Sequence, residues 1–186
     1  IVSTDDAEIA QVARDFGADV PFIRPPQLAD DQAPTVPVIV HAIEQCQSYG
    51  WNIEAVCCIY PGVPFISKND LQVALQQLLE TGASYVFPVT GFPSPIQRAL
   101  RRLPDGSVKP FQSEYAARRT QDLDPGYFDV GQFYWGKTSS WLQNLNLHLN
   151  GVTLLVPEWR SVDIDTPEDW ERAELLYSVL SDKKKL

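Results

Sequence analysis

The chain has 186 residues and a formal net charge of −9, with 44% hydrophobic and 21% charged residues. This composition is typical of an ordinary globular protein of about one domain. The acidic balance excludes a nucleic-acid polymer as partner, because such a partner requires a basic surface that neutralises its phosphates. A single nucleotide is compatible with it, because Mg²⁺ and a few local cations can mask the phosphates.

The cysteines and the apolar runs indicate a cellular compartment. Cys46, Cys57 and Cys58 form no CxxC motif, and His41 and His148 are isolated, so a zinc site is not expected. Free thiols are typical of a reducing compartment. The apolar runs are too short to cross a bilayer and no signal peptide is visible, so we expect a cytoplasmic protein without a membrane partner.

Helix and strand patterns alternate through the first half of the chain. Residues 1–3 are expected to end a strand, Asp5 or Asp6 to cap a helix, and Val20–Ile23 to form a short strand. A helix should follow from about Val36, then a strand at Ala55–Tyr60, a helix capped by Ser67 with Asp70 three residues on, and a strand at Tyr85–Val89. In the first helix the apolar positions at helical spacing are Ile9, Val12, Ala13 and Phe16.

This rhythm predicts an α/β protein, a three-layer sandwich around a mostly parallel, Rossmann-like sheet with right-handed crossovers. Residues 1–186 are expected to form one domain, and residues 91–135 an antiparallel excursion within it. The excursion should contain a hairpin of Ala99–Leu103 and Val108–Phe111 with its tip at residues 104–106. Such an excursion suits a sugar pocket or a contact with a second subunit.

The end of the chain carries the clearest local signals. A short helix at Ser139–Leu145 and a strand at Val152–Val156 are expected before the last helix. Thr166 and Asp169 form a capping box there, and Pro167 takes the first helical position.

Two acidic motifs are candidates for metal binding. In Asp163-Ile164-Asp165 both carboxylates can face one ion, because residues two apart in an extended segment point the same way. Mg²⁺ takes a few hard oxygens and completes its shell with water and phosphate. The alternative is that Asp165 merely sits beside the start of the last helix. Asp5 and Asp6, at the end of the opening strand, either add a metal-facing oxygen or cap the first helix.

The excursion carries a third group of polar and aromatic residues. Its members are Arg98, Arg101, Arg102, Arg118, Arg119, Gln121, Asp122, Asp129 and the run Gln132-Phe133-Tyr134-Trp135. Arginine binds a planar carboxylate with two parallel hydrogen bonds, and amides and aromatic faces suit a hydroxylated, N-acylated sugar. The alternative is a surface hairpin with solvated charges. No nucleophilic triad and no Walker-type or GxGxxG loop is present in the sequence.

Several long strings together resemble one enzyme family. They are VSTDDAEIAQVARDFGADVPFIRP, VPVIVHAIE, SPIQRALR, RTQDL, YFDVGQFYWG and VDIDTPEDWERAE. In these strings the chain resembles the pseudaminic acid cytidylyltransferases, which belong to the wider group that makes CMP-activated sialic acids and CMP-3-deoxy-manno-octulosonate. The resemblance runs in register from the first residue to about Tyr177.

The resemblance implies a transfer of CMP from CTP to an acidic nine-carbon sugar, with Mg²⁺ as cofactor and a homodimer as the assembly. It implies that Asp163, Asp165 and Asp5 are catalytic metal ligands, and that Arg24 and Thr35 lie on the nucleotide side. The sugar side would be lined by Tyr60, Gln97, Arg98, Arg119, Gln121, Asp122, Gln132, Phe133 and Tyr134.

The family begins with a strand and a loop rich in glycine and basic residues that holds the triphosphate, and this stretch is not in the sequence. We therefore expect little or no turnover from residues 1–186 alone. Other hypotheses are a cytidylyltransferase for N-acylneuraminate or 3-deoxy-manno-octulosonate, a glycosyltransferase that holds a metal-diphosphate with Asp163 and Asp165, and a non-catalytic homologue.

Overall fold

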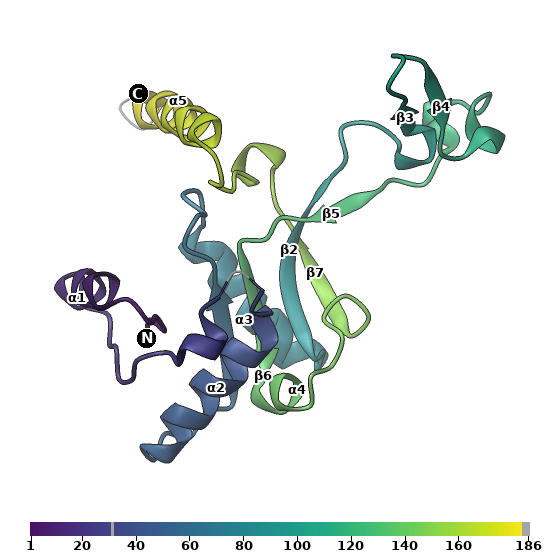
Figure 1. The fold of residues 1–186 in the computed structure, drawn as a ribbon. Helices are drawn as coiled ribbons and strands as arrows, with labels where there is room; N and C mark the ends of the chain where they lie inside the picture. Colours follow the sequence, from purple (N-terminus) through teal and green to yellow (C-terminus); the bar gives the residue numbers. More distant parts are fainter. Residues whose placement is uncertain (31, 184–186) are drawn as a thin grey trace. The chain divides into compact units, whose positions relative to one another are not determined.

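The computed structural model describes residues 1–30 and 32–183 (Figure 1). The α-helices are α1 (Ala7–Asp15), α2 (Thr35–Ser48), α3 (Lys68–Thr81), α4 (Thr138–Leu142) and α5 (Pro167–Lys183). The strands are β1 (Ala55–Ile59), β2 (Tyr85–Gly91), β3 (Leu100–Arg102), β4 (Val108–Pro110), β5 (Tyr127–Asp129), β6 (Phe133–Lys137) and β7 (Gly151–Leu155). Short 3-10 turns lie at Pro26–Leu28, Ile96–Arg98, Ser113–Tyr115, Thr120–Asp122 and Glu158–Arg160. None of the helices in this described part is long and apolar enough to cross a membrane.

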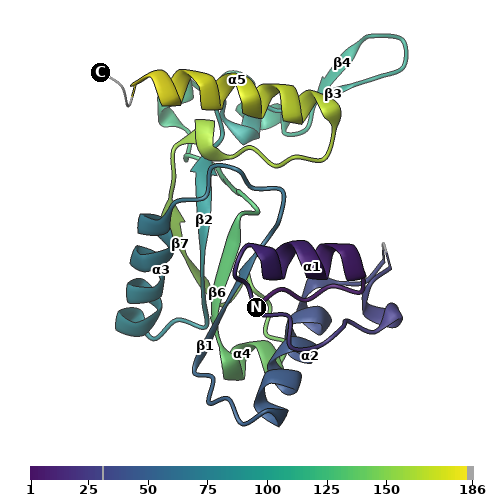
Figure 2. The ribbon, with the colours of Figure 1, turned by 90° about the vertical axis from the view of Figure 1, so that its left-hand side faces the viewer.

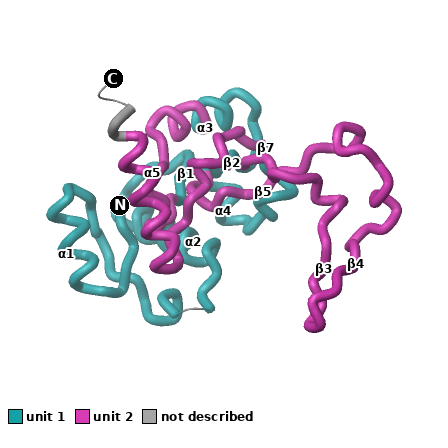
Figure 3. The backbone as a smooth tube through the Cα atoms, turned by 90° about the horizontal axis from the view of Figure 1, so that it is seen from above, with its two compact units in different colours: residues 1–58, 75–86, 135–151 teal, residues 59–74, 87–134, 152–186 magenta. Residues whose placement is uncertain are grey.

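The chain divides into two compact units, coloured separately in Figure 3. Unit 1 consists of Ile1–Cys58, Leu75–Val86 and Trp135–Gly151. Unit 2 consists of Ile59–Ala74, Phe87–Tyr134 and Val152–Leu186. Each unit is therefore built from segments that are distant in the sequence.

Unit 1 has its core around two aromatic rings. Tyr85 and Trp141 are fully buried, with ring centroids 4.8 Å apart, and the Tyr85 hydroxyl donates to the Ser140 carbonyl at 2.8 Å. Gly136 lies directly against both rings, because a Cβ placed on it would be 2.5 Å from Trp141 Nε1. Helix α2 buries Ile39, Ile43 and Cys46, and it packs against α4. The core thus depends on a glycine where a side chain would not fit.

The beginning of unit 1 differs from the sequence expectation. Neither residues 1–3 nor Val20–Ile23 forms a strand, because only isolated hydrogen bonds join these segments: Val2 to Asp19 and Arg24 to Thr4. Asp6, and not Asp5, caps α1 by accepting from the amides of Glu8 and Ile9, so one of the two expected caps is confirmed. The expected apolar face of α1 is only partly buried, since Ala10 is in the core but Phe16 is 89% exposed.

The sheet is also different from the expected one. Hydrogen bonds join β1, β6, β2 and β5 in that order, and β7 pairs with β2 as well. Strand β2 is antiparallel to β6 at Tyr85 and Val86, and antiparallel to β5 at Val89–Gly91. The mostly parallel, Rossmann-like sheet is therefore not confirmed. The physical reason is that the chain leaves β2 through the excursion and returns directly into β5 and β6, without a helical crossover that would reverse its direction.

The expected hairpin and the last capping box are confirmed in unit 2. Strands β3 and β4 pair antiparallel with Leu100 opposite Pro110 and Arg102 opposite Val108, and Figure 2 shows them side by side. Gly106 takes a positive φ of 84° in the turn. At the start of α5, Asp169 accepts from the amide and hydroxyl of Thr166, and the Thr166 hydroxyl accepts from the Asp169 amide.

Candidate functional site

Asp163 lies in the irregular segment between the turn Glu158–Arg160 and α5, and Asp165 lies at a bend just before α5. The Asp163 carboxylate is bordered by the backbones of two glycines. A Cβ placed on Gly62 would be 2.9 Å from Asp163 Oδ1, and one placed on Gly131 would be 3.9 Å from Oδ2. The next residue is fixed, because the Ile164 amide donates to the Gly62 carbonyl at 2.9 Å. The segment thus presents Asp163 at a defined place in unit 2.

The electrostatics around Asp163 favour a cation. Partial desolvation raises the pKa of the Asp163 carboxyl, and the negative charges of Asp165 and Asp169 raise it as well. Two exposed carboxylates with hard oxygens suit Mg²⁺, which uses one or two carboxylates and takes its other ligands from water and phosphate. Among residues 1–30 and 32–183, no group of three or more His, Cys, Asp or Glu side chains gathers to hold a metal. The donor set therefore fits a magnesium ion that is shared with a substrate phosphate.

A second group of side chains surrounds Gly131. The Tyr134 hydroxyl donates to Asp129 Oδ2 at 3.0 Å, and the Gly131 amide donates to Asp129 Oδ1 at 2.9 Å. The Tyr60 ring meets the Tyr134 ring edge-on, with centroids 5.8 Å apart. Because Gly131 also borders Asp163, the predicted sugar-side residues Tyr60 and Tyr134 belong to the same neighbourhood as the predicted metal site.

Asp129 is a candidate to which the sequence motifs gave no role of its own. Its two carboxylate oxygens fix the Gly131 backbone and the Tyr134 hydroxyl. The signal was in the string YFDVGQFYWG, where an acid precedes a glycine by two residues and a tyrosine by five. That spacing alone does not show that the chain folds back on the carboxylate.

Gln132 and Phe133 have a different environment from the one that a sugar-lining role requires. Their side chains are 1% and 0% exposed. The side-chain amide of Gln132 donates to the main-chain carbonyl of Arg160. The main-chain carbonyl of Gln132 accepts from the main-chain amide of Tyr60 at 3.1 Å. In this structure both side chains face the interior, so their contact with a sugar stays a prediction from the resemblance.

The predicted residues of the excursion make their contacts within the excursion, and three of them, Arg119, Gln121 and Asp122, contact one another. Gln97 donates to the Asp124 carbonyl at 3.0 Å, and Arg98 to the Thr120 hydroxyl at 3.4 Å. Arg119 and Asp122 form an exposed ion pair at 3.5 Å, and the Gln121 amide lies against the Arg119 guanidinium. A cavity of about 290 Å³ lies beside them, lined by residues 91–95, 120 and 123–127.

The predicted nucleotide-side residues belong to unit 1. Arg24 donates from Nε to the Ser3 hydroxyl at 3.1 Å and from Nη2 to the Ser3 carbonyl, so its guanidinium holds the segment that ends in Asp5. Asp5 is exposed and is not the residue that caps α1. Thr35 is the first residue of α2. The roles of Asp5, Arg24 and Thr35 stay predictions.

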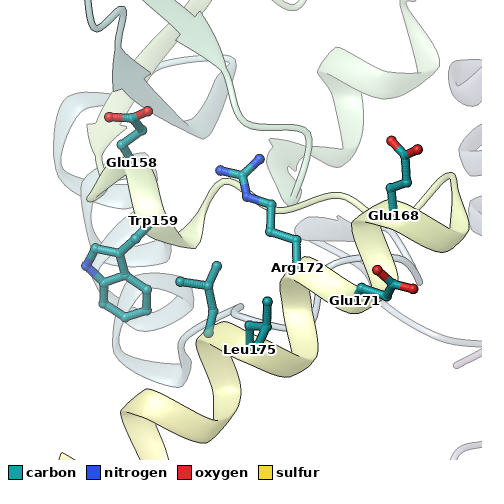
Figure 4. A pocket seen from close by; sticks show the side chains of 7 residues that line it. Glu158, Trp159, Glu168, Glu171, Arg172 and Leu175 are labelled. Carbon is teal, nitrogen blue, oxygen red and sulfur yellow. The ribbon is translucent and has the colours of Figure 1, made fainter.

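Two further cavities of unit 2 are, like the one beside the excursion, lined by none of the predicted residues. One of about 610 Å³ is lined by Glu158, Trp159, Glu168, Glu171, Arg172, Leu175 and Leu176 (Figure 4). Another of about 380 Å³ is lined mainly by apolar residues, among them Phe65, Ile164 and Trp170. We place the site at Asp163, because the acidic cluster and the two glycine backbones are there.

Cysteine chemistry does not contribute a nucleophile. Burial raises the pKa of Cys57 to about 12, with the neighbouring Cys58 adding to the effect, and burial raises the pKa of Cys58 to about 11. Both thiols are therefore neutral at physiological pH, and it is the thiolate that reacts.

Comparisons with known proteins identify a family model and several proteins that are similar to this chain. A family model described as cytidylyltransferase matches residues 1–97. The pseudaminic acid cytidylyltransferase of Campylobacter jejuni strain 81-176 is 35% identical over 180 residues, which are 96% of this chain and 78% of that protein. The CMP-N,N'-diacetyllegionaminic acid synthase of Legionella pneumophila is 27% identical over 187 residues, also 96% of this chain and 78% of that protein.

A solved structure is similar in fold. It is the CMP:2-keto-3-deoxy-manno-octonic acid synthetase complexed with CTP, with a TM-score of 0.61 and 14% sequence identity. The similarity covers 95% of this chain and 79% of that one. At this identity it shows a similar α/β fold and nothing about the ligand of this chain.

Proposed function

Because the chain belongs to the cytidylyltransferase family, we propose that it transfers CMP from CTP to an acidic nine-carbon sugar, with pseudaminic acid as the acceptor. The observation that carries the choice of sugar is the 35% identity over 96% of the chain to an enzyme named for pseudaminic acid. The relative named for diacetyllegionaminic acid matches the same share of the chain at 27% identity.

The proposed reaction is a single in-line displacement. The anomeric hydroxyl oxygen of the sugar forms a bond to the α-phosphorus of CTP, and the bond from that phosphorus to the bridging oxygen breaks. Pyrophosphate leaves with the electron pair, and the hydroxyl proton passes to solvent. Little covalent chemistry is left to the protein, so its residues mainly position the reactants and stabilise charge.

Asp163 and Asp165 would hold Mg²⁺ through their exposed carboxylates. When bound, the ion supplies positive charge that offsets the charge developing on the phosphates. The chain itself fixes the backbone beside Asp163 through the bond from the Ile164 amide to the Gly62 carbonyl. The pKa of Asp163 is raised first by desolvation and then by the charges of Asp165 and Asp169, and a bound cation would offset both effects.

Tyr60 and Tyr134 would form the near part of the sugar side, and Asp129 would hold the Tyr134 hydroxyl in place. Arg98 and Arg119 are the residues suited to the sugar carboxylate, since a guanidinium binds it through two parallel hydrogen bonds. A homodimer and a cytoplasmic location stay predictions from the sequence.

The test is a substrate panel on the purified full-length protein. CTP, UTP and ATP are each combined with pseudaminic acid, N-acetylneuraminic acid, N,N'-diacetyllegionaminic acid and 3-deoxy-manno-octulosonate, and pyrophosphate release and the sugar nucleotide are measured. We expect turnover with CTP and pseudaminic acid above every other pair. A higher kcat/KM for another sugar would overturn the choice of acceptor, and binding of a UDP- or GDP-sugar without any CTP turnover would overturn the reaction.

A further inference from the structure

We propose that Gln132 and the buried Arg160–Asp70 ion pair form a clamp that positions Asp163. The proposal rests on the proposed function, because it gives a reason for holding Asp163 in one place. It assigns Gln132 a positioning role instead of a contact with the sugar, and it gives Arg160 and Asp70 a role that the sequence motifs did not indicate.

The first part of the clamp is an ion pair in the interior of unit 2. Arg160 Nη2 lies 2.5 Å from Asp70 Oδ2, and the two side chains are only 15% and 12% exposed. Arg160 ends the turn Glu158–Arg160, and Asp70 lies in the first turn of α3. A buried charge without its partner is strongly unfavourable, so each residue fixes the place of the other.

The second part is the amide of Gln132. It donates to the Arg160 carbonyl and is almost completely buried, so a sugar could not reach it without a rearrangement of the core. The backbone of the same residue accepts from the Tyr60 amide at 3.1 Å. Gln132 therefore links the turn that contains Gly62 to the segment that leads to Asp163.

These contacts hold the segment 160–164 at both ends. Arg160 is fixed by Asp70 and Gln132, and Ile164 is fixed by its amide bond to the Gly62 carbonyl. Between them Val162 is buried in a cluster with Phe65 and Ala173. Asp163 is the residue in this held segment whose side chain is exposed. A carboxylate that binds a metal ion needs a fixed position, and a backbone held on both sides provides it better than a free loop does.

The main experiment measures hydrogen exchange at the Ile164 amide by NMR, without metal or nucleotide. Gln132→Leu removes the bond to the Arg160 carbonyl, and the double variant Asp70→Asn/Arg160→Met removes both charges together, so that no unpaired charge is left buried. We expect exchange at Ile164 to become about tenfold faster in each, the size of effect that losing one supporting hydrogen bond produces. Glu80→Gln, on the exposed end of α3 where Glu80 accepts from Gln76, should leave it unchanged.

A second readout separates positioning from simple stability. Binding of Mn²⁺ in the presence of CTP is followed by electron paramagnetic resonance, and kcat and the KM for the sugar are measured beside it. For Gln132→Leu we expect weaker Mn²⁺ binding and a lower kcat, with the KM for the sugar unchanged. Arg160→Lys keeps a positive charge opposite Asp70 and should retain more Mn²⁺ affinity than the double variant.

The outcomes distinguish the clamp from the enzyme activity. Unchanged Ile164 exchange in the folded Gln132→Leu protein overturns the clamp, and so does a raised KM for the sugar with normal Mn²⁺ binding. Faster Ile164 exchange together with weaker Mn²⁺ binding supports the clamp, even in a protein that shows no CTP turnover, and in that case only the proposed function fails.

Discussion

At the scale of single residues, Asp163 shows how a candidate functional position can oppose stability. Its carboxyl has a raised pKa, first because of burial and then because of Asp165 and Asp169. The folded protein therefore holds this proton more tightly than the unfolded chain does. Ionisation of Asp163 therefore lowers the free energy of unfolding. This loss is absent below the ordinary pKa of the unfolded chain and appears as the pH rises through the raised pKa of the folded protein.

Asp163→Asn should therefore separate stability from turnover. Without the charge, the variant should melt slightly higher than wild type at pH 7, on the order of 1–2 °C because solvent screens an exposed carboxyl, and at the same temperature near pH 3. Its CTP turnover should fall by about 10²-fold or more. Melting curves from pH 3 to 8 and pyrophosphate release are the measurements. A variant less stable than wild type at pH 7 would show that the charge of Asp163 does not oppose folding.

Gly131 is the second residue whose replacement is informative. It has a positive φ of 69°, and its Cβ position lies 3.9 Å from Asp163 Oδ2. Gly131→Ala should lower the free energy of unfolding by roughly 1–2 kcal/mol, because this backbone conformation strains a residue with a Cβ. Gly131→Asn should be less destabilised, since asparagine tolerates the left-handed region, yet it places an amide beside Asp163.

Comparing these two variants separates backbone strain from crowding at the site. We expect both to need more Mg²⁺ for half-maximal turnover than wild type, although only Gly131→Ala loses much stability in denaturant melts. Gly91→Ala is the matched control, because nothing lies within 4 Å of its Cβ position. If Gly131→Asn has the wild-type Mg²⁺ requirement, the space beside Asp163 is not limiting.

At the scale of the elements, the fit between β6 and the aromatic pair of unit 1 depends on Gly136. A Cβ there would lie 2.5 Å from Trp141 Nε1 and 2.7 Å from Tyr85 Cδ1, and both rings are fully buried. Gly136→Ala should therefore destabilise the protein by roughly 2–3 kcal/mol through overpacking. Urea titration measures it, with Gly91→Ala as control. A loss in the free energy of unfolding below about 0.5 kcal/mol would mean that the two rings can shift to accommodate the added methyl group.

Elements fixed by local signals could be predicted, and those fixed by distant partners could not. The capping box of Thr166 and Asp169 and the turn at Gly106 depend on neighbours within four residues, and both were recognised. The direction of β5 and β6 depends on how the whole excursion returns, so periodicity gave no information about it.

The same distinction applies to the candidate site. The spacing of Asp163 and Asp165 is local and marks them as a pair from the sequence alone. The ion pair of Arg160 with Asp70 joins residues far apart in the chain, whereas the sequence around Asp70 indicates only a local helix cap. Gln132 lies in a segment whose polar and apolar residues alternate. Which face of that segment is buried depends on its contacts with distant parts of the chain, and the local sequence does not show these contacts.

At the scale of the whole molecule, the net charge of −9 opposes the approach of a triphosphate. Under the proposed function, a divalent cation has to reduce this repulsion before CTP can bind well. We therefore expect CTP binding, measured by calorimetry, to weaken by about tenfold or more when Mg²⁺ is replaced by EDTA. Metal-free binding should become tighter as KCl rises from 20 to 200 mM, because salt screens like charges.

The acids at the site separate this general effect from a specific one. In Asp163→Ala/Asp165→Ala the net charge is less negative by two, so metal-free CTP should bind as well as or better than it does to wild type. Adding Mg²⁺ should then improve binding much less than in wild type, because the ion can mask the phosphates but finds no carboxylates beside them. If Mg²⁺ raises the affinity for CTP equally in wild type and in the double variant, the ion acts on the nucleotide alone. The assignment of Asp163 and Asp165 as metal ligands would then be wrong.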